Sequence, residues 1–341
     1  MLNIILSFDY ELFFGENTKD ASSILFDPTN KIMDVLDTHG VKGTFFVDTL
    51  SYDKHKEIGE TDYCNEFLKQ CTDMIKRGHE AQLHIHAHWI ATQYNSKLKR
   101  WICDPNEYRL QSYSKDIMEK VIDNGVDFIG HCSESAGVSQ KCIAFRAGGL
   151  TLTPEKELVE LLIKKGFLFD SSVAPYTYSN ITGADYDYRH VPSKLNWKIS
   201  PHIGVNVDAN VDKYALTEIP IATIKNNVFR IVLQKQPARI ANPAPGGIGF
   251  IRNVSKGTLF VKIKNKIVDY HWISLDTRSA TLIAGDLRAL YRKYDCSHHN
   301  YTVALIGHPK MFNQRNVDNL RELIEILQND NKFQIVSFCD L

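Results

Sequence analysis

The chain has 341 residues, 43% of them hydrophobic, and its 40 lysines and arginines balance its 40 aspartates and glutamates. A chain of this length and composition buries a large core, and the balanced charge excludes a general basic field that would hold nucleic acid or an anionic membrane surface. Its seven cysteines are widely spread and include no Cys-x-x-Cys pair, which is typical of reduced thiols.

The first expected element is a buried strand over residues 4–8 (IILSF), and two acidic residues, Asp9 and Glu11, follow it directly. In an α/β protein the carboxyl ends of parallel strands meet at the catalytic face, so acids there are placed to bind a metal or to move a proton. The same residue types also cap helices or lie in solvated loops, and other motifs must decide between these interpretations.

The next elements alternate between helix and strand. Pro28 begins a helix that ends at Gly40, and residues 41–47 form the following strand. A second helix covers about residues 62–76, with apolar side chains at helical spacing, and leads to a strand that ends at His84. This repetition of β-α-β units predicts a parallel barrel.

Four of the thirteen histidines lie within residues 79–88, where that apolar strand ends. Neutral imidazole is the commonest protein ligand for zinc and related metals. We select His84 and His88 as the ligand pair, because two ligands on one short segment lower the entropy cost of assembling a site. We place His86 outside the ligand set, since its direction depends on whether the strand continues past His84.

A strand followed by an ionisable residue occurs twice more in the chain. Residues 142–145 lead to Arg146, and residues 303–307 lead to His308. Further helices are expected at about residues 115–124, from Pro154 to Gly166 and at 317–328, with a last strand at 333–338.

Between about residues 176 and 300 the alternation of helix and strand stops. Short alternating segments at 203–207, 216–223 and 258–263 are typical of strands, and two prolines and two glycines at 242–247 indicate a loop. We expect a single domain over residues 1–341, with a β-rich insertion at about 176–300 that helps to shape the substrate cleft.

Together these motifs resemble the polysaccharide deacetylases, the carbohydrate esterase family that includes chitin and peptidoglycan deacetylases. The resemblance rests on their order: residues 7–11 (SFDYE), 43–47 (GTFFV), 78–88 (the histidine motif), 145–149 (FRAGG), 169–172 (FDSS) and 305–308 (LIGH). The opening motif and RAGG are most similar to the lipopolysaccharide-biosynthesis branch. The resemblance implies a distorted (β/α) barrel of this family's type, and a metal-dependent hydrolase that removes N-acetyl groups from an amino sugar.

The resemblance also implies roles for the residues at the strand ends. Asp9 would be the general base, Arg146 would hold it by a bidentate contact, and His308 would protonate the departing amine. Three residues would hold a divalent metal, with Zn²⁺ the expected ion: Glu11, His84 and His88.

One departure from the family pattern leaves an alternative open. The family's first motif has two adjacent aspartates, and here the second position is Tyr10. We therefore assign Glu11 as the ligand and Asp9 as the base, with the exchange of these roles as the alternative. Asp170, in the fourth motif, is expected to orient His308 or to contact substrate, and a turn or capping acid is the competing interpretation.

Two other function classes stay open at this point: hydrolysis of another C–N bond, as in allantoinase-like members that act on cyclic amides, and a catalytically silent carbohydrate-binding homologue. The expected partner is an acetamido-sugar or glycan, without nucleic acid and without an integral membrane segment. Residues 1–3 run into the first strand without a signal-peptide pattern, which predicts a cytoplasmic protein that acts on an intracellular precursor.

Overall fold

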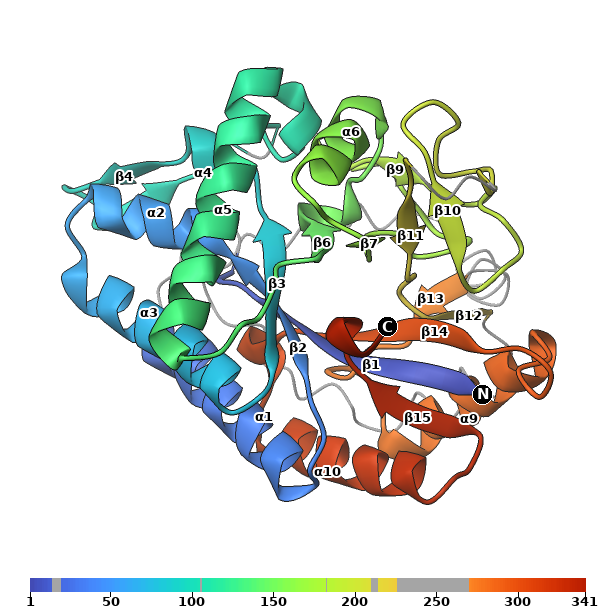
Figure 1. Ribbon diagram of the computed structural model, residues 1–341. Helices are drawn as coiled ribbons and strands as arrows, with labels where there is room; N and C mark the ends of the chain where they lie inside the picture. The colour runs from blue at the N-terminus through green and yellow to red at the C-terminus, as the bar shows by residue number, and fades with distance from the viewer. Residues whose placement is uncertain (14–19, 105, 182, 210–213, 226–269) are drawn as a thin grey trace, which may run out of the picture.

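The structure, a computed structural model, describes residues 1–13, 20–104, 106–181, 183–209, 214–225 and 270–341. Its central strands are β1 (Leu2–Tyr10), β2 (Thr44–Asp48), β3 (Glu80–Ile85), β6 (Ala144–Ala147), β7 (Phe169–Asp170), β10 (Trp197–Ile199), β11 (Leu216–Glu218), β14 (Tyr301–Gly307) and β15 (Phe333–Val336). They form one curved sheet in the order β10-β11-β7-β6-β3-β2-β1-β14, and β15 also pairs with β1 (Figure 1).

The sheet is parallel from β11 to β14, and β10 is antiparallel to β11. Its two ends approach each other beyond β11. There the amide of Ala222 donates to the carbonyl of Ala304 in β14 at 2.8 Å, and the amide of Ala304 donates to the carbonyl of Pro220 at 3.0 Å. The expected distorted (β/α) barrel is thereby confirmed, and β10 and β11, which lie within the expected insertion, are strands of the central sheet.

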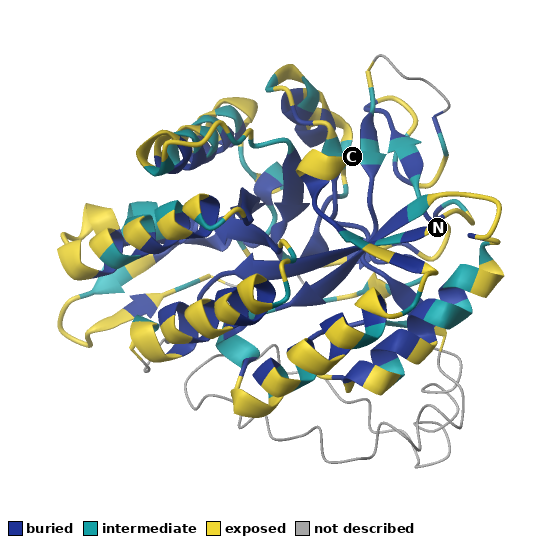
Figure 2. Cartoon of the chain, turned by 60° about the horizontal axis from the view of Figure 1, so that its bottom comes forward, coloured by how far each residue is buried: buried dark blue, intermediate teal, exposed yellow. Residues whose placement is uncertain are grey.

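Helices cover the outside of this barrel, with their exposed faces turned to solvent and the strands buried between them (Figure 2). Their bounds are α1 (Asp27–Thr38), α2 (Thr49–Glu57), α3 (Thr61–Lys76), α4 (His88–Ala91), α5 (Lys115–Ala136), α6 (Lys156–Lys164), α9 (Ala280–Lys293) and α10 (Gln314–Gln328). In the part of the chain that the structure describes, no helix has both the length and the apolar character needed to cross a membrane.

Most predicted helices are confirmed, and α5 differs because it continues twelve residues past the expected end at 124. The residue after the expected end, Gly125, lies where the helix packs closely on β3, since a Cβ atom there would come within 2.4 Å of the Leu83 side chain. The glycine is a packing position and not a terminator.

The insertion is only partly described. Residues 203–207 form turns and not the expected strand. No described strand pairs with them, and the amides of Ile203 and Gly204 both bond to the Ser200 carbonyl. Residues 216–223 contribute β11 and the start of β12 (Thr223–Lys225), which pairs with β13 (Tyr270–Trp272). The expected strand at 258–263 and the loop at 242–247 lie outside the described residues.

Candidate metal and acid–base site

Side chains from the carboxyl ends of four strands meet at one edge of the barrel. They are Asp9 and Glu11 at the end of β1, His84 in β3, Arg146 in β6 and His308 after β14. The first four are buried, and His308 is partly exposed. Parallel strands bring residues distant in sequence to this edge, as the pattern of strand-end ionisable residues predicts.

Two imidazoles and one carboxylate form a group of metal-ligand type. Atoms of Glu11, His84 and His86 all lie within 4.8 Å of one another. The Nε2 atom of His84 is 3.1 Å from Oε2 of Glu11, and Nε2 of His86 contacts the same oxygen. Nδ1–H of His84 donates to the carbonyl of Arg146 at 2.7 Å, so its Nε2 is the nitrogen that faces the group. Two imidazoles and a carboxylate are a donor set that can hold a divalent metal ion.

His88, which we selected from the sequence as a ligand, lies beside this group and not in it. His86 occupies the ligand position that we expected for His88. The His88 ring is 5.4 Å from the His86 ring and stacks on Tyr108 at 5.4 Å. Burial, and then the positive field of His86, hold the pKa of His88 well below its usual value. β3 continues one residue past His84, to Ile85, and the chain turns at Ala87 before His88 begins α4. His86 precedes this turn and contacts the same Glu11 oxygen as His84, whereas His88 follows it.

Arg146 holds Asp9 by one oxygen. Its Nη1 donates to Oδ1 of Asp9 at 2.5 Å, and its other donors bond Ser7 Oγ at 2.9 Å, Ser171 Oγ at 3.0 Å and the Ser171 carbonyl at 2.9 Å. The contact is therefore end-on and not the expected bidentate one. Burial opposes ionisation of Asp9, but the charges of Arg146 and His84 outweigh it and hold the pKa of Asp9 below its usual value.

His308 is oriented by an acid that sequence reasoning missed, Asp276. Oδ2 of Asp276 accepts from Nδ1 of His308 at 2.8 Å, and Nε2 of His308 lies 3.7 Å from Oδ2 of Asp9. Burial alone would lower the pKa of His308, but the hydrogen bond and charge of Asp276 raise it. Asp276 follows Ile273, Ser274 and Leu275, and Ser274 bridges to Ile306 in β14. This short alternating run is a weaker signal than the apolar strand before Asp9.

Asp170 has a different environment from the one expected. Its Oδ2 accepts from the amide of Ser172 at 2.9 Å and its Oδ1 from the Ser172 hydroxyl at 2.8 Å, while Asp276 occupies the orienting position beside His308. Burial raises the pKa of Asp170, and burial together with Asp170 raises the pKa of Glu218 well above its usual value. Asp170 thus stabilises the local turn at Ser172, the alternative role given above, and does not orient His308.

Two more charged residues border the ligand group. Nζ of Lys310 donates to Oε1 of Glu11 at 2.6 Å and to the Leu12 carbonyl at 2.9 Å. Burial opposes ionisation of Glu11, but His86 and Lys310 outweigh it and hold the pKa of Glu11 well below its usual value. On the other side, Asp48 at the end of β2 accepts from the amide of His86 at 3.2 Å. Neither Lys310 nor Asp48 was among the sequence candidates.

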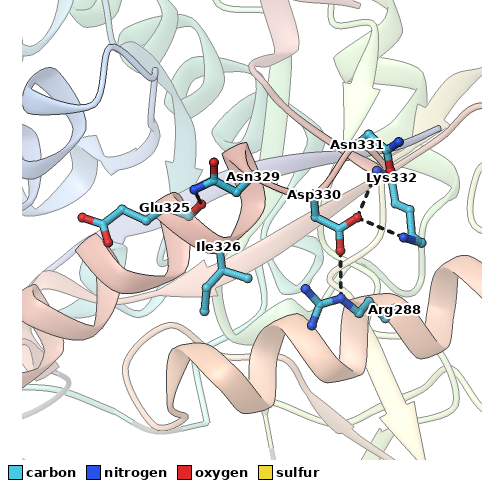
Figure 3. Close-up of a pocket in the computed structure, with 7 residues that line it drawn as sticks. All are labelled: Arg288, Glu325, Ile326, Asn329, Asp330, Asn331 and Lys332. Atoms are coloured by element: carbon cyan, nitrogen blue, oxygen red, sulfur yellow. Dashed lines mark hydrogen bonds and ion pairs between the residues drawn. The ribbon is translucent and has the colours of Figure 1, made fainter.

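A surface hollow of about 780 Å³ lies elsewhere, beside the carboxyl end of α10 and near α9 (Figure 3). Within it Arg288 and Lys332 both bind Asp330, at 2.8 and 3.2 Å. This part of the chain leads into the amino end of β15, so the hollow lies at the opposite edge of the barrel from the histidines. It contains none of the candidate residues, and its remaining acid, Glu325, lies 3.5 Å from Nε2 of His39 outside the hollow.

The sequence comparisons agree with this site. The family model described as polysaccharide deacetylase matches residues 5–131, a segment that includes Asp9, Glu11, His84 and His86. The match confirms the expected enzyme class, a carbohydrate deacetylase. A search of curated proteins found no matching relative.

Solved structures share the fold over 99% of this chain. They include a probable polysaccharide deacetylase from Pseudomonas aeruginosa (12% identity, 89% of that chain, TM-score 0.50), PuuE allantoinase (11% identity, 88%, TM-score 0.50) and 4-alpha-glucanotransferase from Thermococcus litoralis (12% identity, 40%, TM-score 0.52). At these identities the likeness shows the barrel alone, and the chemistry must be argued from the site.

Proposed function

We propose that this chain is a polysaccharide deacetylase, the family whose model matches residues 5–131, and that it removes N-acetyl groups from an amino sugar in surface-polysaccharide or lipopolysaccharide biosynthesis. One observation carries the proposal. The ligand group of Glu11, His84 and His86 lies beside an acid, Asp9, that Arg146 keeps ionised. We treat the chain as a single catalytic domain over residues 1–341.

The ligand group fits a divalent metal, and we assign its binding to Glu11, His84 and His86, with Zn²⁺ as the expected ion. The fit rests on the donor types and on the Arg146 carbonyl, which fixes the proton of His84 on Nδ1 and leaves Nε2 as the ligand atom. When bound, such an ion supplies a Lewis acid that polarises an acetyl carbonyl and lowers the pKa of a bound water.

Asp9 is the general base in this proposal. Arg146 occupies its Oδ1, whereas its Oδ2 faces the site, 4.0 Å from Nε2 of His84 and 3.7 Å from Nε2 of His308. Oδ2 is therefore the atom that takes a proton from the attacking water. Because Glu11 and not Asp9 belongs to the ligand group, the geometry supports Asp9 as base over the exchanged assignment.

His308 is the general acid. Asp276 holds Nδ1 and directs Nε2 into the site, toward Oδ2 of Asp9. The raised pKa of His308 keeps the imidazolium form populated near neutral pH, as a residue that protonates a departing amine requires. Base and acid thus lie side by side, and each is oriented by its own charged partner.

Two measurements test the proposal: metal content of the purified protein by elemental mass spectrometry, and acetate release from acetamido sugars. We expect near-stoichiometric metal and acetate release, both lost in His84→Ala. His298→Ala, at an exposed histidine, is the matched control and should retain both. A panel of cyclic amides is assayed as alternative substrates under the same conditions. Turnover of cyclic amides alone would replace deacetylation with another C–N hydrolysis, and a protein that neither binds metal nor turns over would contradict the proposal.

A further inference from the structure

A small hairpin projects from the molecule next to α2 and α4 (Figure 1). Its strands are β4 (Gln93–Asn95) and β5 (Arg100–Ile102), which pair antiparallel. It follows directly after α4, the helix that begins at His88. The hairpin therefore belongs to the same edge of the barrel as the candidate site.

The root of the hairpin is anchored beside the site. The buried Trp101 ring lies 5.3 Å from Trp89 and 5.1 Å from Tyr94. Trp89 in turn donates its Nε1–H to Asp48 at 2.9 Å, and Asp48 also holds the amide of His86. This chain of contacts fixes the direction in which the hairpin points relative to the catalytic histidines.

The tip of the hairpin combines positive charge with exposed apolar side chains. Lys97, Lys99 and Arg100 are exposed, Leu98 between them is 56% exposed and Ile102 is 45% exposed. Residues 93–102 contain no acidic residue, although the whole chain has no net charge. We name these ten residues the basic hairpin.

The backbone at the tip presents these side chains in a defined turn. Oδ1 of Asn95 accepts from the amides of Lys97 and Leu98, at 3.1 and 2.9 Å. Lys99 takes a positive φ of 49°. A non-glycine residue in this conformation is uncommon, so the turn fixes Leu98 at the apex with lysines on both sides.

We propose that the basic hairpin docks on an anionic lipid surface. Apolar side chains flanked by lysine and arginine are the composition that enters the headgroup region of a bilayer, where aliphatic groups leave water and cations meet phosphates. A purely acidic protein partner would use the three cations but would leave Leu98 and Ile102 without a role. In this contact the hairpin lies in the headgroup region and does not cross the bilayer.

The docking has a consequence for the substrate. The hairpin and the site share one edge of the barrel, so a docked enzyme holds its catalytic residues close to the headgroup region. On the proposed deacetylase function, this favours an amino sugar attached to a lipid through a phosphate over a free sugar. The membrane contact itself does not depend on that function.

Sedimentation with lipid vesicles tests the docking. We expect the full chain to bind vesicles of phosphatidylcholine mixed with phosphatidylglycerol, not phosphatidylcholine alone, and to bind less at high salt. Each cation removed should weaken binding about fivefold. The triple change Lys97→Gln, Lys99→Gln and Arg100→Gln should therefore weaken it by about two orders of magnitude.

Matched controls separate the effect of the hairpin on vesicle binding from the effects of total charge and of exposed apolar side chains elsewhere. Lys31→Gln, Lys69→Gln and Lys76→Gln remove the same charge from exposed positions on α1 and α3, and should leave vesicle binding unchanged. Leu98→Asn should weaken binding, whereas Leu168→Asn should not, although Leu168 is 54% exposed.

The outcomes distinguish this inference from the proposed function. Absence of binding to anionic vesicles, or equal loss in the hairpin and control triples, would overturn the docking. All hairpin variants should keep wild-type acetate release from soluble acetamido sugars, since none of these residues belongs to the site. Hairpin-dependent vesicle binding by a protein without deacetylase activity would keep the docking and reject the deacetylase function.

Discussion

The ammonium of Lys310 lies 2.6 Å from Oε1 of Glu11, while Oε2 of the same carboxylate faces His84 and His86. A second bond, to the Leu12 carbonyl at 2.9 Å, fixes the lysine in place, and its side chain is 12% exposed. One oxygen of Glu11 thus bonds to Lys310, and the other contacts the two histidines of the ligand group.

Lys310→Met should destabilise the metal-free protein, because it removes a charged hydrogen bond to a buried carboxylate. We expect the free energy of unfolding to fall by about 2 kcal/mol in urea titrations with a chelator present. Added Zn²⁺ should reduce the difference, since a bound cation compensates Glu11. Lys42→Met, which breaks a surface pair with Asp340, is the control and should change stability by less than about 0.5 kcal/mol.

The two histidines that sequence and structure assign differently can be separated directly. His86→Ala should weaken Zn²⁺ binding by more than about 100-fold, because loss of a ligand exceeds the usual cost of losing its outer partner. His88→Ala should retain the metal, since its ring lies outside the ligand group. Isothermal titration of both variants is the measurement, and the reverse order of affinities would restore the sequence-based choice of His88.

Asp9→Asn should keep the metal and lower kcat by about 10²- to 10⁴-fold, the range for loss of a general base. The amide still accepts a hydrogen bond from Arg146 but cannot take a proton from water. Metal content and acetate release should be measured on the same preparation. A variant that loses its metal would show that Asp9 is a ligand and that its role and that of Glu11 are exchanged.

Asp276→Asn should move the alkaline limb of the pH–rate profile to lower pH. His308 acts when protonated, so activity falls as pH rises through its pKa, and Asp276 is a main reason that this pKa is raised. Without the carboxylate the imidazolium loses its proton earlier. Profiles of kcat/KM for both proteins provide the test, and an unmoved limb would remove His308 from the role of acid.

His55 should make stability depend on pH. Burial lowers its pKa from 6.5 to about 4, and Nδ1 bonds the Ser51 carbonyl at 2.6 Å. Between these values the unfolded chain binds more protons than the folded one, so stability falls as pH falls below 6.5. We expect the loss of stability from pH 7 to pH 5 to be about 2 kcal/mol smaller in His55→Phe than in the unchanged protein. His79, whose pKa burial also lowers to about 4, contributes to the loss in both proteins. Urea unfolding of both proteins at both pH values measures this free energy. An equal change between pH 7 and pH 5 in the two proteins would contradict the lowered pKa of His55.

The barrel and the meeting of its strand ends were predictable because both follow from local patterns. Asp9, Glu11, Arg146 and His308 each follow an apolar run, and parallel strands must bring such residues to one edge. The choice between His86 and His88 was not predictable in this way. It depends on where β3 ends and the chain turns into α4, a difference of one or two residues.

Other residues of the site were hidden for physical reasons of their own. Asp276 lies in the segment without helix–strand alternation, joined to β14 by an isolated bridge at Ser274. Lys310 carries no strand or helix signal, and its contact with Glu11 spans most of the sequence. The family resemblance supplied the proposed base, the proposed acid and part of the proposed ligand set, while the contacts that orient them came from tertiary structure alone.

Arg146 also connects non-adjacent strands through the interior of the barrel. In the sheet β6 is separated from β1 by β3 and β2, yet the guanidinium on β6 reaches Ser7 and Asp9 on β1 and binds Ser171 beyond β7. One side chain therefore links β1, β6 and the end of β7 across the barrel and also orients Asp9, the proposed base. Core substitutions far from the site that shift β1 against β6 would be felt at Asp9, so selection on packing and selection on reactivity act here on the same geometry.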